Sequence, residues 1–266
     1  MTVTIVGCGN MGIMFAHALV KDNIVAKENL LLLEKSEDRK ADIEKLNVGQ
    51  VVEDTDSRIS ETNTFIIAVK PQGFEAMAKD LKHLFKSANC IISIMAGVTI
   101  ERISQLLDNN NIVRAMPNSP CELGMGMTGF TAHSNLDIKQ VHKAENLLAT
   151  TGRAVFFEKE DLIDACTAVS GSGPAYFFYI VKNMIDAGTK LGLKESTAAM
   201  LVKQTMLGSF HLMNTSEKEL DELIKSVASK GGTTQAALDT FDASGVGEGL
   251  IKGMKRARDR AKELSN

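Results

Sequence analysis

The segment GCGNMG at residues 7–12 follows an apolar run at residues 3–6 and precedes apolar residues at helical spacing. A G-x-G-x-x-G segment between a first strand and a first helix is typical of dinucleotide-binding sites. The first glycine permits the tight turn, the second lets the backbone approach a pyrophosphate, and the third lets helix and strand pack closely. The pattern therefore predicts a dinucleotide site, with an ordinary glycine-rich turn as the alternative. The residues of this predicted cofactor site are Gly7, Gly9, Asn10, Met11 and Gly12.

Strand and helix patterns alternate through the first half of the chain. The predicted strands cover residues 3–6, 30–34, 65–69, 91–94, 112–116, 127–132 and 154–157. The predicted helices cover residues 11–21, 72–85, 99–107 and 137–151. Short apolar strands that alternate with helices indicate an α/β domain with a parallel, doubly wound sheet. We therefore expect a dinucleotide-binding domain over residues 1–158.

The second half has no strand pattern after residue 158. Its predicted helices cover residues 160–170, 174–191, 195–214, 217–226, 234–243 and 247–264. Ser216 and Glu219 have the spacing of a capping box at the start of one of them. The helix at 174–191 is apolar on several faces, which favours an interface between subunits over a deep core position. We expect an all-α domain over residues 159–266, arranged as a compact bundle.

The net charge and the spacing of the cysteines exclude some classes of function. The chain has 266 residues and a net charge of −3, so no overall basic field attracts nucleic acid or an anionic membrane. The cysteines form no C-x-x-C pair, and none lies near a histidine at the spacing of a metal site. We interpret them as reduced thiols and expect no metal. No apolar stretch reaches the ~18–20 residues of a membrane helix, and no basic leader is present, so we expect a cytoplasmic protein.

Further candidate residues follow the ends of predicted strands, where ligands lie in open α/β sheets. In AVKPQ at residues 68–72, the proline holds the preceding lysine extended. This backbone can line the nicotinamide–ribose side of a dinucleotide, and an ordinary strand-to-helix turn is the alternative. Ala-Gly at residues 96–97 would let a ring or ribose approach closely. In RAMPNSP at residues 114–120, an amide and a hydroxyl follow the strand. We assign Asn118 to the substrate, and we assign to the cofactor Ala68, Val69, Lys70, Pro71, Ala96 and Gly97.

The segment EKSEDR at residues 34–39 bears on the choice of cofactor. An acid at the end of the second strand usually binds the ribose hydroxyls of NAD, whereas basic and hydroxyl groups favour the extra phosphate of NADP. Glu34 is the acid here, and Lys35, Ser36 and Arg39 are groups that can reach a phosphate. The sequence favours NADPH, with NADH as the alternative, and Lys35 joins the predicted cofactor residues.

The segment GGTT at residues 231–234 precedes a predicted helix. Consecutive glycines before threonines expose backbone N–H groups and two hydroxyls, which suits a carboxylate. A threonine N-cap with a flexible lead-in is the alternative. We find no convincing nucleophile or acid–base pair, because the histidines are scattered and no G-x-S-x-G segment occurs. Hydride transfer to an electrophilic C=N bond needs positioning and charge complementarity more than a dedicated base.

Taken together, the motifs resemble those of the pyrroline-5-carboxylate reductase family. The segments that carry the resemblance are GCGNMG (7–12), AVKPQ (68–72), RAMPNSP (114–120), SGSGPAY (170–176) and GGTTQAAL (231–238). The resemblance implies an α/β N-terminal Rossmann-type dinucleotide-binding domain plus an all-α C-terminal dimerisation domain. It implies reduction of 1-pyrroline-5-carboxylate to L-proline with NAD(P)H, the last step of proline biosynthesis. It also implies a homodimer, with further assembly into a decamer left open.

The resemblance assigns roles to residues of the second half. It implies that Gly231, Gly232, Thr233 and Thr234 hold the carboxylate and ring of the substrate, that Thr234 supplies the hydroxyl near the imine nitrogen, and that Glu217 lies near the substrate. Three positions depart from the family pattern. Lys230 stands where a proline is usual, Lys182 where an acid is frequent, and Ser226 where an asparagine or similar group occurs.

Two other functions compete with this interpretation. A β-hydroxyacid dehydrogenase also joins a glycine-rich nucleotide domain to a helical domain, and it would need a catalytic lysine in its long central helix. Lys182 lies in such a helix. That function gives no reason for the GGTT segment. The other competitor is a non-catalytic dinucleotide sensor that binds a protein partner.

Overall fold

The structure, a computed structural model, describes residues 1–265, and the chain divides into two compact units. Unit 1 contains residues 1–173 together with the end of the chain from Ala257, and unit 2 contains residues 174–256. The domain boundary between residues 158 and 159 stays a prediction.

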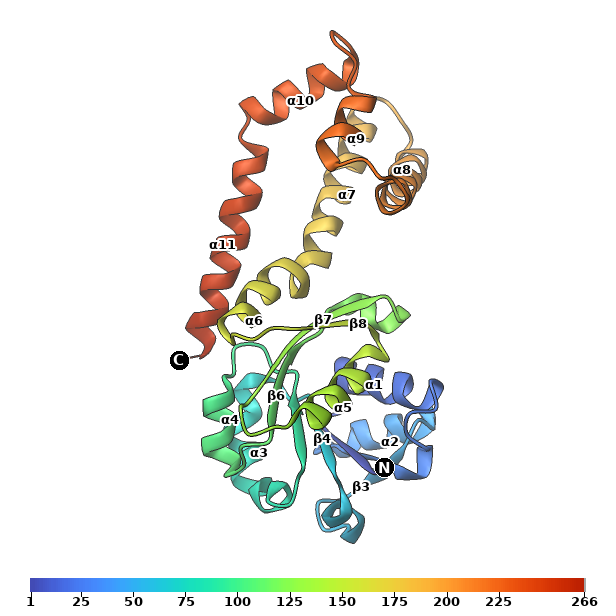
Figure 1. The fold of residues 1–266 in the computed structure, drawn as a ribbon. Helices are drawn as coiled ribbons and strands as arrows, with labels where there is room; N and C mark the ends of the chain where they lie inside the picture. Colours follow the sequence, from blue (N-terminus) through green and yellow to red (C-terminus); the bar gives the residue numbers. More distant parts are fainter. Residues whose placement is uncertain (266) are drawn as a thin grey trace. The chain divides into compact units, whose positions relative to one another are not determined.

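Unit 1 is built on one eight-stranded sheet in the order β3-β2-β1-β4-β5-β6-β7-β8 (Figure 1). The strands are β1 (Val3–Val6), β2 (Leu30–Leu33), β3 (Gln50–Val52), β4 (Thr64–Ile67), β5 (Cys90–Ser93), β6 (Ile112–Met116), β7 (Gly126–Ala132) and β8 (Gly152–Phe156). Pairing is parallel throughout except between β6 and β7. The prediction of a parallel sheet is wrong at this one pairing. Only a short 3-10 turn (Ser119–Leu123) lies between the two strands, and a parallel crossover needs a dozen or more residues.

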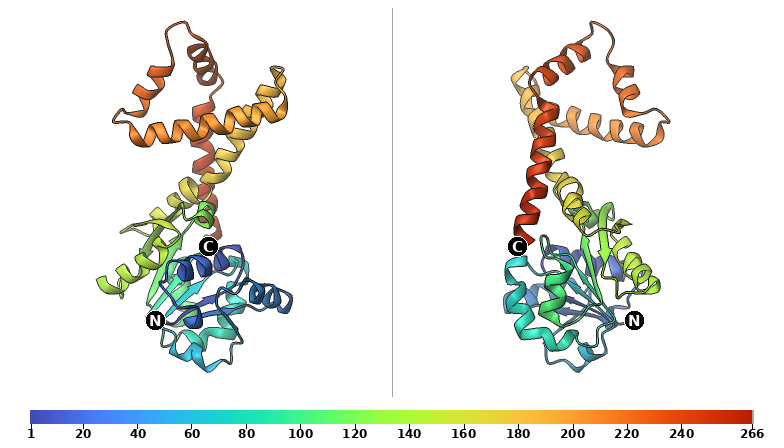
Figure 2. Two further views of the ribbon diagram at one scale, coloured as in Figure 1. Left: turned by 90° about the vertical axis from the view of Figure 1, so that its right-hand side faces the viewer. Right: turned by 60° about the vertical axis from the view of Figure 1, so that its left-hand side comes forward.

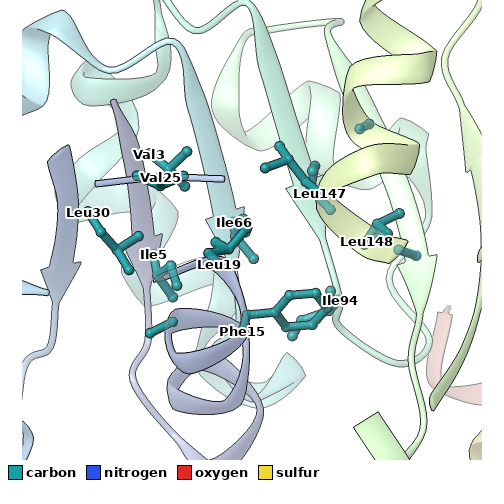
Figure 3. Close-up of a cluster of buried hydrophobic side chains, with 14 of the residues drawn as sticks. Val3, Ile5, Phe15, Leu19, Val25, Leu30, Ile66, Ile94, Leu147 and Leu148 are labelled. Atoms are coloured by element: carbon teal, nitrogen blue, oxygen red, sulfur yellow. The ribbon is translucent and has the colours of Figure 1, made fainter. Parts of the chain in front are cut away.

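Helices cover the two faces of this sheet (Figure 1). One face packs against α1 (Asn10–Lys21) and α5 (Ile138–Ala149), and the other packs against α3 (Phe74–Leu81) and α4 (Ile100–Leu107). Figure 3 shows Phe15 and Leu19 of α1 near Ile5 and Ile66 of the sheet. Because the sheet is covered on both faces, the central strands are continuous apolar runs, and all four leucines of β2 are buried.

Helix α2 (Glu37–Leu46) and the edge strand β3 were not predicted from the sequence. Helix α2 is strongly polar, and of its ten residues only Lys40 and Ile43 are buried. Strand β3 has three residues and pairs with β2 alone. Segments that bury so few apolar side chains leave no clear periodic pattern in the sequence.

A buried ion cluster fixes α6 (Asp161–Cys166) to the sheet. Arg114 of β6 is 1% exposed. Its Nη1 lies 2.9 Å from Glu160 Oε1 and its Nη2 lies 2.6 Å from Asp164 Oδ1. Glu160 Oε1 also accepts the backbone N–H of Ile100 at the start of α4. One guanidinium therefore joins the start of α6 to the middle of the sheet.

Unit 2 is helical, as expected, but its helices do not close around a core of their own. The helices of the second half are α7 (Gly173–Lys190), α8 (Glu195–Thr215), α9 (Leu220–Val227), α10 (Thr233–Ala243) and α11 (Val246–Ser265). Figure 2 shows α7 to α10 from two further sides. Among residues 174–256, Ala198 is the one buried residue. Large apolar side chains such as Phe178, Tyr179 and Met200 are more than 60% exposed. The expectation of a compact bundle is therefore wrong for the single chain, whose apolar faces stay open.

The predicted capping box at Ser216 is also wrong. Helix α9 begins at Leu220 with Glu219 as its N-cap, and Glu222 completes the box. Ser216 instead ends α8, and its hydroxyl accepts the N–H of Lys218. Glutamate and serine both accept from free N–H groups at a helix start, so spacing alone does not distinguish the two registers.

Among residues 1–265, no helix has both the length and the apolar character that a membrane crossing requires.

Replacing Asp164 by alanine removes one of the two carboxylates that hold Arg114 and leaves the guanidinium buried with half its partners. Loss of one partner of a buried ion pair costs about 3–5 kcal/mol. We expect a lower thermal unfolding midpoint, followed by circular dichroism. Asp161→Ala is the matched control, because Asp161 lies exposed on the same helix and should change the midpoint little. Equal midpoints for the two variants would contradict this role of the cluster.

Candidate functional site

Gly7, in the loop after β1, and Gly12, in the first turn of α1, allow β1, α1 and the end of β4 to pack closely. Gly7 has φ +88°, and a Cβ there would lie 2.7 Å from the side chain of Val69. A Cβ at Gly12 would lie 2.2 Å from the carbonyl oxygen of Gly7. Neither position has room for a side chain. The sequence-based reason for the first and third glycines, a tight turn and close packing of helix and strand, agrees with this geometry.

Gly9 differs from Gly7 and Gly12, because packing within the chain does not require a glycine at this position. Its φ of −66° suits any residue, and a Cβ there would meet no heavy atom within 4 Å in residues 1–265 beyond its chain neighbours. Gly9 is the N-cap of α1, and no side chain caps this end of the helix among the described residues. The free N–H groups of the first turn therefore border an unfilled space. This cradle fits the pyrophosphate of a dinucleotide.

The register of the sheet brings the other predicted cofactor residues to the same edge. Val6 pairs with Leu33 on one side and Ile67 on the other, so Gly7, Glu34 and Ala68 come next to one another at the carboxyl ends of β1, β2 and β4. The strand order reverses at β1, which is the place where open α/β sheets bind ligands. A cavity of about 450 Å³ lies here, and its lining includes Gly7, Glu34, Lys35, Val69, Gly73 and Met77.

Glu34 is held against the glycine-rich loop. Its Oε2 accepts the N–H of Cys8 at 3.0 Å, and its Oε1 accepts the N–H groups of Lys35 and Ser36 at 2.9 and 3.1 Å. Arg39 donates from Nε and Nη2 to the carbonyl oxygen of Cys8. The sequence showed an acid and a base near this point, but it did not show that both are bonded to the loop.

The Cys8 thiol is inert in these surroundings. Burial raises its pKa to about 12, and the nearby Glu34 carboxylate adds to the rise, while Arg39 acts in the opposite direction. Its Sγ lies 3.8 Å from the carbonyl oxygen of Leu33. All four cysteines are buried and unpaired. In the part of the chain that the structure describes, no group of three or more His, Cys, Asp or Glu side chains is placed to hold a metal.

Two other strand ends carry predicted cofactor residues. Lys70 is exposed and extended before Pro71, as the sequence indicated, and Pro71 begins a 3-10 turn. Ala96 is half-buried and precedes Gly97, which has φ +71°. A Cβ at Gly97 would lie 2.8 Å from the Cβ of Leu264, so the last turns of α11 fill the adjoining space. The structure thus gives a packing reason for this glycine, separate from the approach of a coenzyme.

The Asn118 side chain is hydrogen-bonded within unit 1, and the Cys121 thiol is one of its donors. Its Nδ2 donates to Ser170 Oγ at 3.2 Å, and its Oδ1 accepts the N–H of Met127 at 2.9 Å. Ser170 belongs to a turn of π-helix (Thr167–Gly171) that continues α6. Asn118 therefore joins the end of β6 to this turn, and its assignment to the substrate stays a prediction.

The GGTT segment forms the start of α10 in unit 2. Gly231 has φ +72°, Gly232 is the N-cap, and Thr233 and Thr234 are the first two helical residues. Since the N-cap is glycine, no side chain caps this end among the described residues. Thr234 is half-buried. The segment is a helix start with free N–H groups, as predicted, and it can accept an anion.

Glu217 and Lys182 lie elsewhere in unit 2. Glu217 is exposed in the connection between α8 and α9, and no hydrogen bond or ion pair within residues 1–265 joins it to residues 231–234. Lys182 Nζ lies 3.0 Å from Asp186 Oδ2 one turn along α7. Both members of this pair are at least half exposed, which is typical of a surface pair on a helix.

Comparison with known proteins relates both halves of the chain to one family. A family model described as pyrroline-5-carboxylate reductase dimerisation matches residues 160–264, and a model described as NADP oxidoreductase, coenzyme F420-dependent, matches residues 2–97. A pyrroline-5-carboxylate reductase of Pseudomonas aeruginosa is 34% identical over 99% of this chain and 96% of its own length.

Solved structures agree with this relationship. A pyrroline carboxylate reductase of Plasmodium falciparum with NADP bound has a TM-score of 0.89 at 26% identity and covers 100% of this chain and 98% of its own. A pyrroline-5-carboxylate reductase of Coxiella burnetii has a TM-score of 0.88 at 30% identity with the same coverage. On the strength of full-length similarity above 30% identity and of a fold shared from end to end, this chain belongs to the pyrroline-5-carboxylate reductase family.

Proposed function

We propose that this chain reduces 1-pyrroline-5-carboxylate to L-proline with NAD(P)H, the last step of proline biosynthesis. The observation that carries the proposal is the open cradle at Gly9, where a free helix N-terminus borders unfilled space at the reversal point of the sheet. Membership of the family identifies the proposed substrate as 1-pyrroline-5-carboxylate. When bound, NAD(P)H supplies the hydride that reduces the carbon of the C=N bond.

Unit 1 holds the coenzyme in this proposal. The N–H groups at the start of α1 bind the pyrophosphate beside Gly9, and Asn10 and Met11 follow in the same turn. The remaining assigned residues lie at the ends of β2, β4 and β5; they are Lys35, Ala68, Val69, Lys70, Pro71, Ala96 and Gly97. The expectation of NADPH over NADH rests on Lys35, Ser36 and Arg39 and stays a prediction from the sequence.

Residues 231–234 anchor the substrate carboxylate. The first N–H groups of a helix have no partner within the helix, and the aligned peptide dipoles place partial positive charge at this end. Lys230 stands directly before the segment and adds a full positive charge where the family usually has proline. Asn118 and Glu217 keep their assignment near the substrate as predictions.

Thr234 forms a hydrogen bond with the nitrogen of the substrate's C=N bond. Reduction of the C=N bond turns this nitrogen into an amine, whose lone pair accepts a hydrogen bond. The Thr234 hydroxyl donates to that lone pair as it forms, which stabilises the transition state more than the ground state. The proton on nitrogen comes from the iminium form of the substrate or from water, so the chain needs no dedicated acid.

A second copy of the chain covers the open faces of unit 2. Residues 174–256 have one buried side chain, and a domain of this size cannot leave so much apolar surface in water. The match to a dimerisation model over residues 160–264 supports self-association. We propose a homodimer, with a decamer as a larger assembly.

We also propose a cytoplasmic location. Four unpaired cysteines suit a reducing compartment such as the cytoplasm.

The Gly9→Val variant should lose the coenzyme and keep the fold, because its side chain would enter the space proposed for the pyrophosphate and its Cβ would meet no heavy atom within 4 Å in the described residues. Titration calorimetry with NADPH and NADH measures binding, and circular dichroism monitors the fold. Gly12→Ala is the comparison variant. Its Cβ would strike the Gly7 carbonyl, so we expect a lower unfolding midpoint there. Tight binding of either coenzyme by Gly9→Val would refute the cradle.

The Thr234→Ala variant should raise KM for the imine and lower kcat. A hydrogen bond between neutral groups contributes about 0.5–1.5 kcal/mol, so we expect kcat/KM to fall about 2–10-fold. Steady-state rates of imine reduction measure the effect, and Thr234→Ser should restore most of the rate. Thr240→Ala is the matched control, because the Thr240 hydroxyl lies on the same helix and bonds to the Ala236 carbonyl. Unchanged kinetics in Thr234→Ala would remove this residue from the mechanism.

The purified protein should be at least a dimer by light scattering. Because association buries the apolar faces of unit 2, the unfolding temperature should rise with protein concentration. Calorimetric scans over a hundredfold range of concentration provide the measurement. A monomer that unfolds at one temperature throughout this range would contradict the proposed assembly.

A further inference from the structure

The cavity at the ends of β1, β2 and β4 lies beside the glycine-rich loop. In the proposed reaction it receives the adenosine half of the dinucleotide, because it adjoins the glycine-rich loop on the β2 side of the reversal point. The two coenzymes differ only here. NADPH brings a phosphate on the ribose 2′ oxygen, with a charge of about −1.5 to −2 at neutral pH, where NADH has a hydroxyl.

Glu34 occupies the place that meets the ribose. Three backbone N–H groups, from Cys8, Lys35 and Ser36, hold its carboxylate beside the loop. The side chain cannot turn away without breaking these bonds. Its Oε2 accepts one hydrogen bond, so a further lone pair remains for a ribose hydroxyl. A 2′-phosphate at the same place would set a second anion against a fixed carboxylate.

The remaining charges of the cavity also oppose a phosphate. Besides Glu34, its lining carries four carboxylates, from Glu37, Glu53, Asp54 and Asp80. Its cations are Lys35 and Lys40, and each is already paired with a carboxylate. Lys40 donates to Glu37 and Glu53, and Lys35 Nζ lies 3.7 Å from Asp80.

The partial positive charge at the start of α2 does not offset this excess of negative charge in the cavity. Helix N-termini attract anions, and Ser36 is the N-cap of α2. The first turn of the helix, however, carries Glu37 and Asp38, whose charges counter the helix dipole. Arg39 has two of its nitrogens on the Cys8 carbonyl oxygen. Of the three groups that favoured NADPH in the sequence, Lys35 and Arg39 therefore already contact other groups of the chain, and Ser36 stands beside the acids of the first turn of α2.

We infer that this chain prefers NADH to NADPH and that Glu34 is the residue that sets the preference. The inference rests on the proposed function and reverses the coenzyme expected from the sequence. Because it concerns binding of the adenosine half, it is tested both with and without the imine.

The first experiment compares the coenzymes on the wild-type protein. Fluorescence titration in the absence of imine should show NADH binding at least about tenfold more tightly than NADPH. The nicotinamide-free probes 5′-AMP and adenosine 2′,5′-bisphosphate should compete in the same order, with the bisphosphate weaker. Tighter binding of NADPH would overturn the inference. Absence of imine reduction with either coenzyme would refute the proposed function and leave these affinities measurable.

The second experiment removes the charge and keeps the shape of the side chain. Glu34→Gln retains an oxygen for the Cys8 N–H, and we expect the ratio of kcat/KM for NADH over NADPH to fall about tenfold, mainly through a lower KM for NADPH. Glu44→Gln makes the same change in net charge at an exposed position of α2 outside the cavity, and it should leave the ratio unchanged. Equal ratios in Glu34→Gln and wild type would show that Glu34 does not select the coenzyme.

Discussion

The proposed site depends first on how closely the backbone approaches itself in the loop after β1. The carbonyl of Gly7 lies so near Gly12 that a Cβ there would come within 2.2 Å of it, and Val69, just beyond the end of the neighbouring strand β4, also lies close to Gly7. These contacts bring the first turn of α1 to the reversal point of the sheet. Without them, the free N–H groups beside Gly9 would not face the space that a pyrophosphate needs.

Charge has different consequences in the two units. At the start of α10, free N–H groups and Lys230 gather positive charge, which suits the carboxylate of the proposed substrate. At the end of β2, carboxylates outnumber cations, and Glu34 is fixed among three N–H groups. A helix start therefore attracts an anion in one place, while α2, with two acids in its first turn, does not. The same backbone feature has opposite effects because the neighbouring side chains differ.

Unit 2 is incomplete as a single chain. Its helices expose the aromatic and methionine side chains that a domain normally buries, and Ala198 alone is buried in residues 174–256. Unit 1 has a full core on both faces of its sheet. Association of two chains through unit 2 would remove the exposed apolar area from water, which is the main favourable term in forming such interfaces.

The sequence by itself determined all but one of the α-helices and all but one of the strands of residues 1–265, the glycine-rich loop, the helix start at residues 231–234 and the family. These features depend on local patterns, namely apolar periodicity and glycines at fixed spacing. The polar helix α2 and the short strand β3 were decided by tertiary contacts that leave little local signal, whereas the reversed pairing of β7 follows from its short connection to β6. Tertiary structure also decided the partners of Arg114, Asn118 and Glu34. A side chain shows its charge in the sequence, but the groups that bind it come from distant segments and are known only when the chain has folded.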